Sequence, residues 1–366
     1  MNNTRLANRY RGVPTITKAG EFRPPINPPF VVKNLFRPGE VAMLAGAPGL
    51  GKSTIAASIA AHAAQGRNLA DLPVRNAVVI YYAAEDPHGV LCRAYPYMRD
   101  PAWAHAPFYV VHGAPNLLDP ETPEEVARFV SDKQKEHKCD QALVIIDTLN
   151  LSIGEADENS SSAMGAVVGN ATYIAERTNS SVVFVHHVGI GNPDRPRGSS
   201  AFHGNVDCLC LLNRASASGT ENVVLLKPVK QKNAQELGAL PFKLSALKIG
   251  TDTDGCDVTV PMAVPMEPNS FKGEKKASEA ANENGRPSKD TAERRADIER
   301  VLAELAKIAP GSFFSAKEIA ARSGSIFNVV RGSDSLRKAV GRTLDALVKV
   351  GKAERGEKGY RSITAN

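Results

Sequence analysis

A short glycine-rich stretch carries the clearest chemistry of this 366-residue sequence, because it follows the phosphate-loop pattern G-x-x-x-x-G-K-[ST] at every specified position. The residues of this stretch are Gly46, Ala47, Pro48, Gly49, Leu50, Gly51, Lys52, Ser53 and Thr54. Glycines let the backbone turn tightly and bring its N–H groups close to phosphate oxygens. The pattern also assigns Lys52 to the β- and γ-phosphates and the hydroxyl of Ser53 to Mg²⁺. It therefore predicts a site for a nucleoside triphosphate and Mg²⁺.

Two acidic residues follow apolar runs at positions that suit hydrolysis of such a nucleotide. Asp147 ends the run 143–146, and a carboxylate there could anchor Mg²⁺. Glu85 follows the run 77–84 and could deprotonate an attacking water, although a solvated loop acid ahead of a helix would occupy the same position. Because ligands of open parallel sheets bind at the carboxyl ends of the strands, we expect both acids near the phosphate loop.

A pair of histidines, His186 and His187, ends the apolar run 182–187. A neutral imidazole can donate a hydrogen bond to a γ-phosphate oxygen with one nitrogen and accept a hydrogen bond with the other. The pair therefore predicts a residue that senses whether the γ-phosphate is present, and either ring is a candidate for it.

These residues must be positioned by a sheet, and short apolar runs alternate with helical patterns from about residue 40. The runs are 41–46, 77–84, 108–113, 142–148 and 182–187. This alternation predicts an α/β fold with a mainly parallel sheet covered by helices on both faces. The later runs 206–213, 222–229, 241–247 and 257–262 leave no room for helices between them, so we expect the sheet to end in antiparallel strands.

A second, smaller unit is predicted at the carboxyl end of the chain. Residues 264–290 hold almost no large apolar side chains and are expected to form a flexible linker. Helical patterns follow at 291–308, 315–324 and 333–347, and a short hairpin pattern follows at 350–363. The apolar stripes of the first and third helices are Ile298, Val301, Leu302, Leu305 and Ile308, and Leu336, Val340, Leu344 and Leu347. This order predicts a winged-helix-like domain over 291–366.

The net charge of the sequence, +6, is located in that second unit. Residues 1–265 hold 25 basic and 25 acidic side chains, whereas residues 291–366 hold 15 and 9. Arg337, Lys338 and Arg342 lie off the apolar stripe of the third helix. The local excess favours contact with DNA, although winged helices also bind proteins.

Composition excludes several classes of protein. A hydrophobic content of 42% with 23% charged residues is typical of folded soluble chains, not of disordered or collagen-like ones. The five cysteines are scattered without a Cys-x-x-Cys pair, which favours a reduced cytoplasm over zinc binding or thiol exchange. No run of about 18 apolar residues occurs, and the amino terminus lacks the pattern of a signal peptide, so a cytoplasmic location is expected.

The motifs together resemble those of the RecA-like P-loop ATPases, and more closely those of the plasmid RepA-type hexameric replicative helicases. The resemblance covers residues 35–235 and rests on GAPGLGKST (46–54), AAEDP (83–87), LVIIDTLN (143–150), EADENSSSAM (155–164), VVFVHH (182–187) and RGSSAF (197–202). It implies a RecA-like ATPase domain over 36–263. The closely spaced prolines of RPPINPPF favour an extended segment over residues 1–35 that precedes this domain. The resemblance also implies a homo-hexameric ring that binds ATP and Mg²⁺ between subunits and single-stranded DNA in its channel, in plasmid or phage DNA replication.

The same resemblance implies roles for individual residues. Lys52 and Ser53 would bind phosphate and metal, Glu85 would activate water, and Asp147 would organise Mg²⁺. His186 or His187 would couple the γ-phosphate to a DNA-contacting loop. Arg197 and Lys232 stand where such helicases carry basic residues that act across the subunit interface. Which of the two is the trans-acting finger stays open, and a lysine would supply a point charge in place of a planar fork.

Residues 188–205 are rich in Gly, Pro and Ser and hold Arg195 and Arg197. We expect this segment to be a loop that tracks the backbone of single-stranded DNA through charge. A DNA-binding ATPase that acts as a recombination mediator or regulatory switch without unwinding is the alternative function. A nucleotide-binding module without turnover is disfavoured, since Glu85 and Asp147 are both present.

Overall fold

The computed structural model describes residues 17–189, 192–198, 200–215, 222–235, 237–267, 289–322, 334–349, 351–356 and 359–363. The chain divides into two compact units, Met1–Lys272 and Gly273–Asn366. Each unit has its own hydrophobic core.

The described strands of the first unit form one sheet of ten strands, in the order β10-β9-β8-β7-β1-β5-β4-β2-β3, with β6 paired to β5. The strands are β1 (Val41–Gly46), β2 (Val78–Ala83), β3 (Phe108–His112), β4 (Ala142–Asp147), β5 (Ser180–Gly189), β6 (Asn192–Pro196), β7 (Cys208–Arg214), β8 (Val223–Gln231), β9 (Leu240–Thr251) and β10 (Asp257–Pro265). Five neighbouring pairs are parallel, namely β7–β1, β1–β5, β5–β4, β4–β2 and β2–β3. The pairs β7–β8, β8–β9 and β9–β10 are antiparallel. The predicted α/β class, with a mainly parallel sheet that ends in antiparallel strands, is confirmed.

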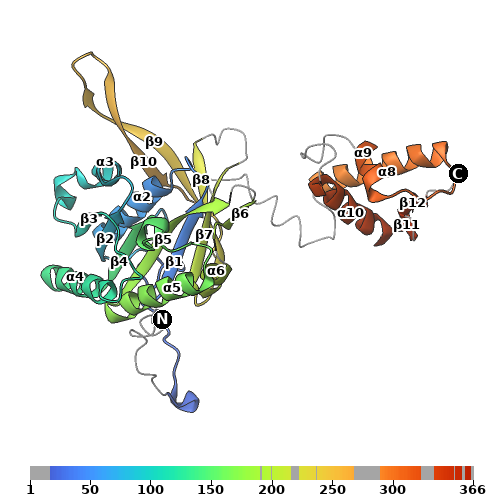
Figure 1. Cartoon of the computed structure of the whole chain (residues 1–366). Helices are drawn as coiled ribbons and strands as arrows, with labels where there is room; N and C mark the ends of the chain where they lie inside the picture. Colours follow the sequence, from blue (N-terminus) through green and yellow to red (C-terminus); the bar gives the residue numbers. More distant parts are fainter. Residues whose placement is uncertain are drawn as a thin grey trace. The chain divides into compact units, whose positions relative to one another are not determined.

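Helices cover both faces of this sheet (Figure 1). The helices are α2 (Lys52–Gln65), α3 (Pro87–Met98), α4 (Thr122–His137), α5 (Ser161–Arg177) and α6 (Ser200–Asn205), with short 3-10 turns at η1 (Ala19–Glu21), η2 (Pro101–Trp103) and η3 (Leu149–Ser152). Side chains alternate along each strand, so Leu44 packs with the core beneath α2 and α3 while Met43 packs with the core beneath α4 and α5. This alternation makes the central strands apolar on both faces.

Helix α2 is buried on nearly every side, since each of its residues except Ser53 is buried. The edge strand β10 reaches this helix and α3, because Ser58 and Tyr97 both donate to the carbonyl oxygen of Ala263, at 2.8 and 2.7 Å. A helix enclosed in this way needs small apolar residues all round, which explains the alanine-rich sequence after Lys52. The helix that begins at the phosphate loop is therefore held firmly in place.

The boundaries of the first unit are wider than the sequence predicts. Residues 1–16 of the predicted extended segment lie outside the described residues, but Val31, Val32 and Leu35 are fully buried in the core. Backbone bonds fix this segment, as in Arg75 N–H donating to the Val31 carbonyl at 2.9 Å. At the other end β10 runs to Pro265, and Met266 N–H donates to the Pro241 carbonyl at 2.8 Å. The predicted limits at 36 and 263 are therefore too narrow, and most of the predicted linker, 268–288, lies outside the described residues.

The second unit contains α8 (Lys289–Ile308), α9 (Ala316–Arg322), α10 (Asp334–Lys349) and the hairpin of β11 (Ala353–Gly356) and β12 (Gly359–Ser362). Its core contains the predicted stripe residues Ile298, Val301, Leu302, Leu305, Val340, Leu344 and Leu347. Ile308 is the exception among the described side chains, since it is the last residue of α8 and is 72% exposed. The side chain of Leu336 lies outside the described residues. Phe314 forms an isolated bridge to Tyr360, which ties the hairpin to the segment before α9. Among the described residues, no helix combines the length and apolar composition that crossing a membrane requires.

Candidate active site

The phosphate loop connects the end of β1 at Gly46 to the start of α2 at Lys52. Gly49 and Gly51 have φ angles of 74° and 80°, in the left-handed region that favours glycine. A Cβ on Gly51 would also lie 2.9 Å from Cδ1 of Leu244, so a side chain there would require Leu244 to shift. The loop therefore brings bare backbone to the amino end of α2, where free N–H groups and the helix dipole attract phosphate.

Lys52 is buried at the base of this loop. Its Nζ donates to the Ala47 carbonyl at 3.2 Å and lies 3.2 Å from Nδ1 of His187. Burial lowers the pKa of Lys52, and the charges of Asp147 and Glu85 act in the opposite direction. The Lys52 ammonium contacts one neutral carbonyl and one neutral imidazole, so its charge can form a charge-assisted hydrogen bond with a phosphate oxygen.

Asp147 ends β4 beside the loop, and only 5% of its surface is exposed. Tyr81 on the neighbouring strand donates its hydroxyl to Oδ2 of Asp147 at 2.6 Å. Burial raises the pKa of Asp147, while hydrogen bonds from Tyr81 and Ser53 lower it. No motif points to Tyr81. A buried tyrosine needs a polar partner for its hydroxyl, and the place of Tyr81 beside Tyr82 in an apolar run indicates that at least one of the two rings is buried.

Glu85 follows β2 at the same edge of the sheet, since Ala83 pairs with Asp147 in the strand register. The hydroxyl of Thr148 donates to Oε1 of Glu85 at 2.8 Å. The adjacent Asp86 is the N-cap of α3, and its Oδ1 accepts a hydrogen bond from the Gly89 N–H at 2.8 Å. The structure therefore separates the two acids of the AAEDP motif into a candidate base and a helix cap. Thr148 is a second residue that the sequence analysis missed.

The two histidines of β5 point to opposite faces of the strand, and their surroundings distinguish them. His187 lies against Lys52, and its pKa is lowered first by burial and then by the Lys52 charge. His186 is only 2% exposed, and burial lowers its pKa to about 4. Its Nε2 lies 3.0 Å from the Arg197 carbonyl, so it donates there when the proton is on Nε2. His187 is thus the ring that faces the phosphate loop.

Residues 188–205, predicted as a loop, are in large part regular. β5 continues to Gly189, β6 returns antiparallel to it over Asn192–Pro196, and α6 follows. The prediction was wrong because two short strands with prolines and glycines carry little periodicity. Arg197 directly follows β6, and its Nε lies 2.6 Å from Oε1 of Glu158. The side chain of Arg195 lies outside the described residues.

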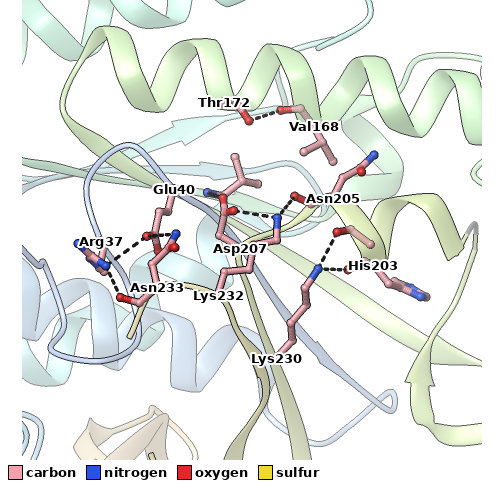
Figure 2. Close-up of polar contacts among 12 residues, drawn as sticks. Arg37, Glu40, Val168, Thr172, His203, Asn205, Asp207, Lys230, Lys232 and Asn233 are labelled. Atoms are coloured by element: carbon pink, nitrogen blue, oxygen red, sulfur yellow. Dashed lines mark hydrogen bonds and ion pairs between the residues drawn. The ribbon is translucent and has the colours of Figure 1, made fainter. Parts of the chain in front are cut away.

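Lys232 lies beside Asp207 and Asn205 (Figure 2), at the opposite edge of the sheet from the phosphate loop of its own chain. Its backbone N–H donates to the Asp207 carbonyl, and Asp207 N–H donates to the carbonyl of Val41 at the start of β1. The six residues of β1 separate this point from the loop by roughly 16 Å. Its Nζ donates to the Asn205 carbonyl and to Oδ1 of Asp207, both at 3.0 Å.

Lys230 has a similar setting, since its Nζ donates to the His203 and Gly204 carbonyls at 2.8 and 2.7 Å (Figure 2). Both lysines thus bind the carbonyl end of α6 within their own chain. Lys232 therefore places no charge at the phosphate loop of its own subunit. A role for this lysine across a subunit interface stays a prediction.

The predicted basic residues of the second unit all lie on α10. Arg342 is exposed, whereas the side chains of Arg337 and Lys338 lie outside the described residues. Neighbouring basic side chains of the hairpin form ion pairs inside the unit, for example Arg355 with Asp345 at 3.2 Å and Lys352 with Glu299 at 3.0 Å.

The residues at the loop fit Mg²⁺ and a nucleotide. Within the described residues, no group of three or more His, Cys, Asp or Glu side chains is arranged to hold a metal ion. Mg²⁺ does not need such a cage, because it keeps several waters and binds through one or two protein oxygens plus phosphates. The Asp147 carboxylate and the Ser53 hydroxyl, which are hydrogen-bonded to each other, supply oxygens of that kind beside the loop.

The match to a protein family agrees with this geometry. The family model described as "AAA domain" matches residues 9–192, half of the chain, and includes the phosphate loop, Glu85, Asp147 and both histidines. A solved structure of the ATPase domain of another protein is similar to the chain, with 14% sequence identity and a TM-score of 0.42 over 57% of this chain and 82% of that one. The phosphate loop and its neighbouring acids, together with the family match, lead to one conclusion: the chain belongs to the AAA domain family and is a P-loop ATPase.

Proposed function

We propose that this ATPase is a DNA helicase or translocase of the RepA type, which hydrolyses ATP at the subunit interfaces of a ring during plasmid or phage DNA replication. One observation carries the proposal: the strand β6 next to Arg197 pairs antiparallel with β5, the strand whose His187 contacts Lys52. A change at the phosphate site therefore has a short covalent and hydrogen-bonded route to a basic surface element. Coupling of this kind is what movement along DNA requires.

The protein groups at the loop have separate tasks in hydrolysis. The N–H groups of the loop and the Lys52 ammonium would hold the β- and γ-phosphates, and Ser53 and Asp147 would hold Mg²⁺. When bound, Mg²⁺ neutralises charge on the phosphate oxygens. Glu85, oriented by Thr148, would orient and deprotonate the attacking water. Tyr81 keeps the Asp147 carboxylate in place through a short hydrogen bond.

His187 is the proposed γ-phosphate sensor. Because Lys52 donates to its Nδ1, the neutral ring carries its proton on Nε2. A γ-phosphate would draw Lys52 toward its oxygens and weaken the contact with His187. The ring would then be free to donate to the same phosphate, and its backbone carbonyl, which accepts the Arg197 N–H at 2.9 Å, would transmit the shift.

The ring and the carboxyl-terminal unit belong to the proposal. Arg197 or Lys232 would approach the nucleotide of a neighbouring subunit. Lys232 would reach that nucleotide either after its Nζ releases the Asn205 carbonyl of α6 or with this hydrogen bond in place. The order of three helices and a hairpin supports a winged-helix-like unit that contacts duplex DNA through α10. Measurement of molecular size with and without ATP tests the ring, because a ring built on nucleotide-bearing interfaces should grow more stable when ATP is bound.

Strand displacement on a forked duplex tests the function directly. We expect ATP-dependent unwinding by the full chain and none by Lys52→Ala, because the variant lacks the phosphate-binding ammonium. Arg195→Ala with Arg197→Ala should abolish stimulation of ATP hydrolysis by single-stranded DNA. The matched control is Arg128→Ala with Lys135→Ala, which removes two exposed charges from α4. Hydrolysis stimulated by DNA without unwinding would favour the recombination mediator or switch instead.

A further inference from the structure

An ion pair ties the proposed DNA-contacting arginine to a second segment at the same edge of the sheet. Nε of Arg197 lies 2.6 Å from Oε1 of Glu158, a residue of the segment between η3 and α5. The two side chains differ in exposure: 62% of Arg197 is exposed, but only 11% of Glu158. The arginine is thus at the surface, while its carboxylate partner is almost enclosed.

Glu158 depends on this arginine for its charge balance. Its Oε1 is buried without a hydrogen bond, even though Nε is close, so the angle is poor and Coulomb attraction makes the contact. A buried carboxylate is costly unless a cation compensates it. Among the described residues, Arg197 is the cation in ion-pair contact with Glu158.

The backbone around Arg197 is fixed on both sides. Arg197 N–H donates to the His187 carbonyl at 2.9 Å, and Nε2 of His186 lies 3.0 Å from the Arg197 carbonyl. Gly198 has a φ of 88°, and a Cβ there would lie 2.9 Å from the Glu158 carbonyl oxygen. The two segments therefore meet at backbone distance. The Arg197 side chain lies at the surface, and its length lets it either reach Glu158 or turn outward.

We infer that Glu158 is a positioning residue that holds the Arg197 guanidinium within its own subunit. The phosphates of single-stranded DNA compete with the Glu158 carboxylate for this one cation. The shift that starts at Lys52 and His187 reaches the Arg197 backbone and changes the outcome of that competition. This inference rests on the proposed function for its DNA half, whereas the ion pair itself can be tested without DNA.

Cleavage by trypsin at the Arg197–Gly198 bond measures how often this segment leaves its contact with Glu158, because trypsin must bind both the arginine side chain and the extended backbone around it. Trypsin must take the arginine side chain into its own pocket, and Arg195 does not interfere because Pro196 follows it. Surface ion pairs contribute about 0–1 kcal/mol, so Glu158→Gln should speed this cleavage about two- to fivefold. Glu155→Gln is the matched control, because it removes an exposed carboxylate from the same segment. Glu158→Asp, which keeps the charge, should restore slow cleavage.

The cleavage outcomes decide the inference as follows. If Glu158→Gln is cut after Arg197 at the rate of the unmodified chain, the ion pair does not hold the side chain. If Glu158→Asp is cut as fast as Glu158→Gln, a carboxylate at this position is not sufficient to hold the guanidinium. Equal cleavage of both variants at a site in α4 shows that neither is unfolded. Each result is read by mass spectrometry of the peptide that ends at Arg197.

Binding of a fluorescent poly-dT oligonucleotide without nucleotide tests the competition. Glu158→Gln should bind about two- to fivefold more tightly than Glu155→Gln, with a salt dependence steeper by about one charge. Equal affinities and equal salt slopes would overturn the competition. If the unmodified chain binds no single-stranded DNA under any condition, the proposed function fails, and the cleavage result still decides whether Glu158 positions Arg197.

Discussion

Replacement of Tyr81 by phenylalanine should damage the metal site without touching nucleotide or metal directly. Tyr81 is fully buried, and its hydroxyl donates to Oδ2 of Asp147 at 2.6 Å. The variant keeps the ring and its packing but removes the donor. Asp147 then retains the hydrogen bond from Ser53 and loses its closest partner.

The size of the effect follows from the burial of the pair. A hydrogen bond to a charged group contributes about 1.5–3 kcal/mol, and each 1.4 kcal/mol is a factor of ten. Because Mg²⁺ and the Ser53 hydroxyl still compensate the carboxylate, we expect the low end of that range, about a tenfold fall in kcat/KM for MgATP. The free energy of unfolding should fall by about 1–2 kcal/mol, since a buried acceptor loses its donor.

The pH profile gives the variant a distinctive signature. Burial already raises the pKa of Asp147, and the Tyr81 hydrogen bond lowers it. Removal of that bond raises the pKa further, so the carboxylate is protonated at a higher pH than in the unmodified chain. The acid limb of kcat/KM should therefore move to higher pH in Tyr81→Phe. More Mg²⁺ should move it back, because the cation favours the charged carboxylate.

Tyr82→Phe is the matched control for this experiment. Tyr82 is the next residue on β2, points to the opposite face of the sheet, and has its pKa raised to about 12 by burial. Steady-state ATPase rates over pH 5–9 at several Mg²⁺ concentrations would compare the two variants. If Tyr81→Phe and Tyr82→Phe have the same kcat/KM and the same acid limb, Tyr81 does not position the carboxylate that hydrolysis needs.

Three further outcomes are expected. Thr148→Val should lower kcat about tenfold or more while KM for ATP stays within twofold, because the lost hydroxyl orients Glu85 and not the phosphates; an unchanged kcat in an ATPase assay would contradict this. His186 is buried with a pKa of about 4, below its ordinary value of 6.5, so its contribution to stability is complete above pH 6.5 and is lost as pH falls toward 4. Denaturant unfolding should show a loss of up to about 3 kcal/mol over that interval, absent from His186→Gln. Truncation after Glu267 should leave ATPase activity intact and weaken duplex binding and its salt dependence, whereas truncation after residue 264 should also destabilise the first unit, since Met266 bonds to Pro241.

Much of the site was predictable because it depends on covalent order. A strand, a glycine loop and a helix fix where Lys52 and Ser53 lie, and acids at the ends of parallel strands must share one edge. The partners of these residues were not predictable in the same way. Tyr81 and Thr148 act through hydrogen bonds across strands, and their spacing in the chain carries no motif. The hairpin after Gly189 was also missed, since short strands rich in Gly and Pro have no clear period.

Lys232 illustrates a different limit of sequence reasoning. The resemblance assigns it the role of a basic residue that acts across the subunit interface, which stays a prediction. An antiparallel strand ends at the opposite edge from its parallel neighbour. β8 runs antiparallel to β7, so its last residues meet Asp207 at the start of β7, and not the phosphate loop. Chain direction within the sheet decides which site a residue can serve, and here it excludes Lys232 from the site of its own subunit.

The paired histidines show how one strand end can serve two purposes. Side chains alternate along β5, so neighbouring rings must face opposite sides of the sheet. His187 faces Lys52, while His186 contacts the carbonyl of Arg197. A single histidine could do only one of these things, whereas the pair joins the phosphate loop to the arginine through consecutive residues of one strand. In the proposed coupling, a shift of the His187 ring would move the backbone that His186 shares. This arrangement explains why the pair stands at the strand end, and it predicts that His187→Ala should reduce the effect of ATP on trypsin cleavage after Arg197, with His112→Ala, at the end of β3, as the control.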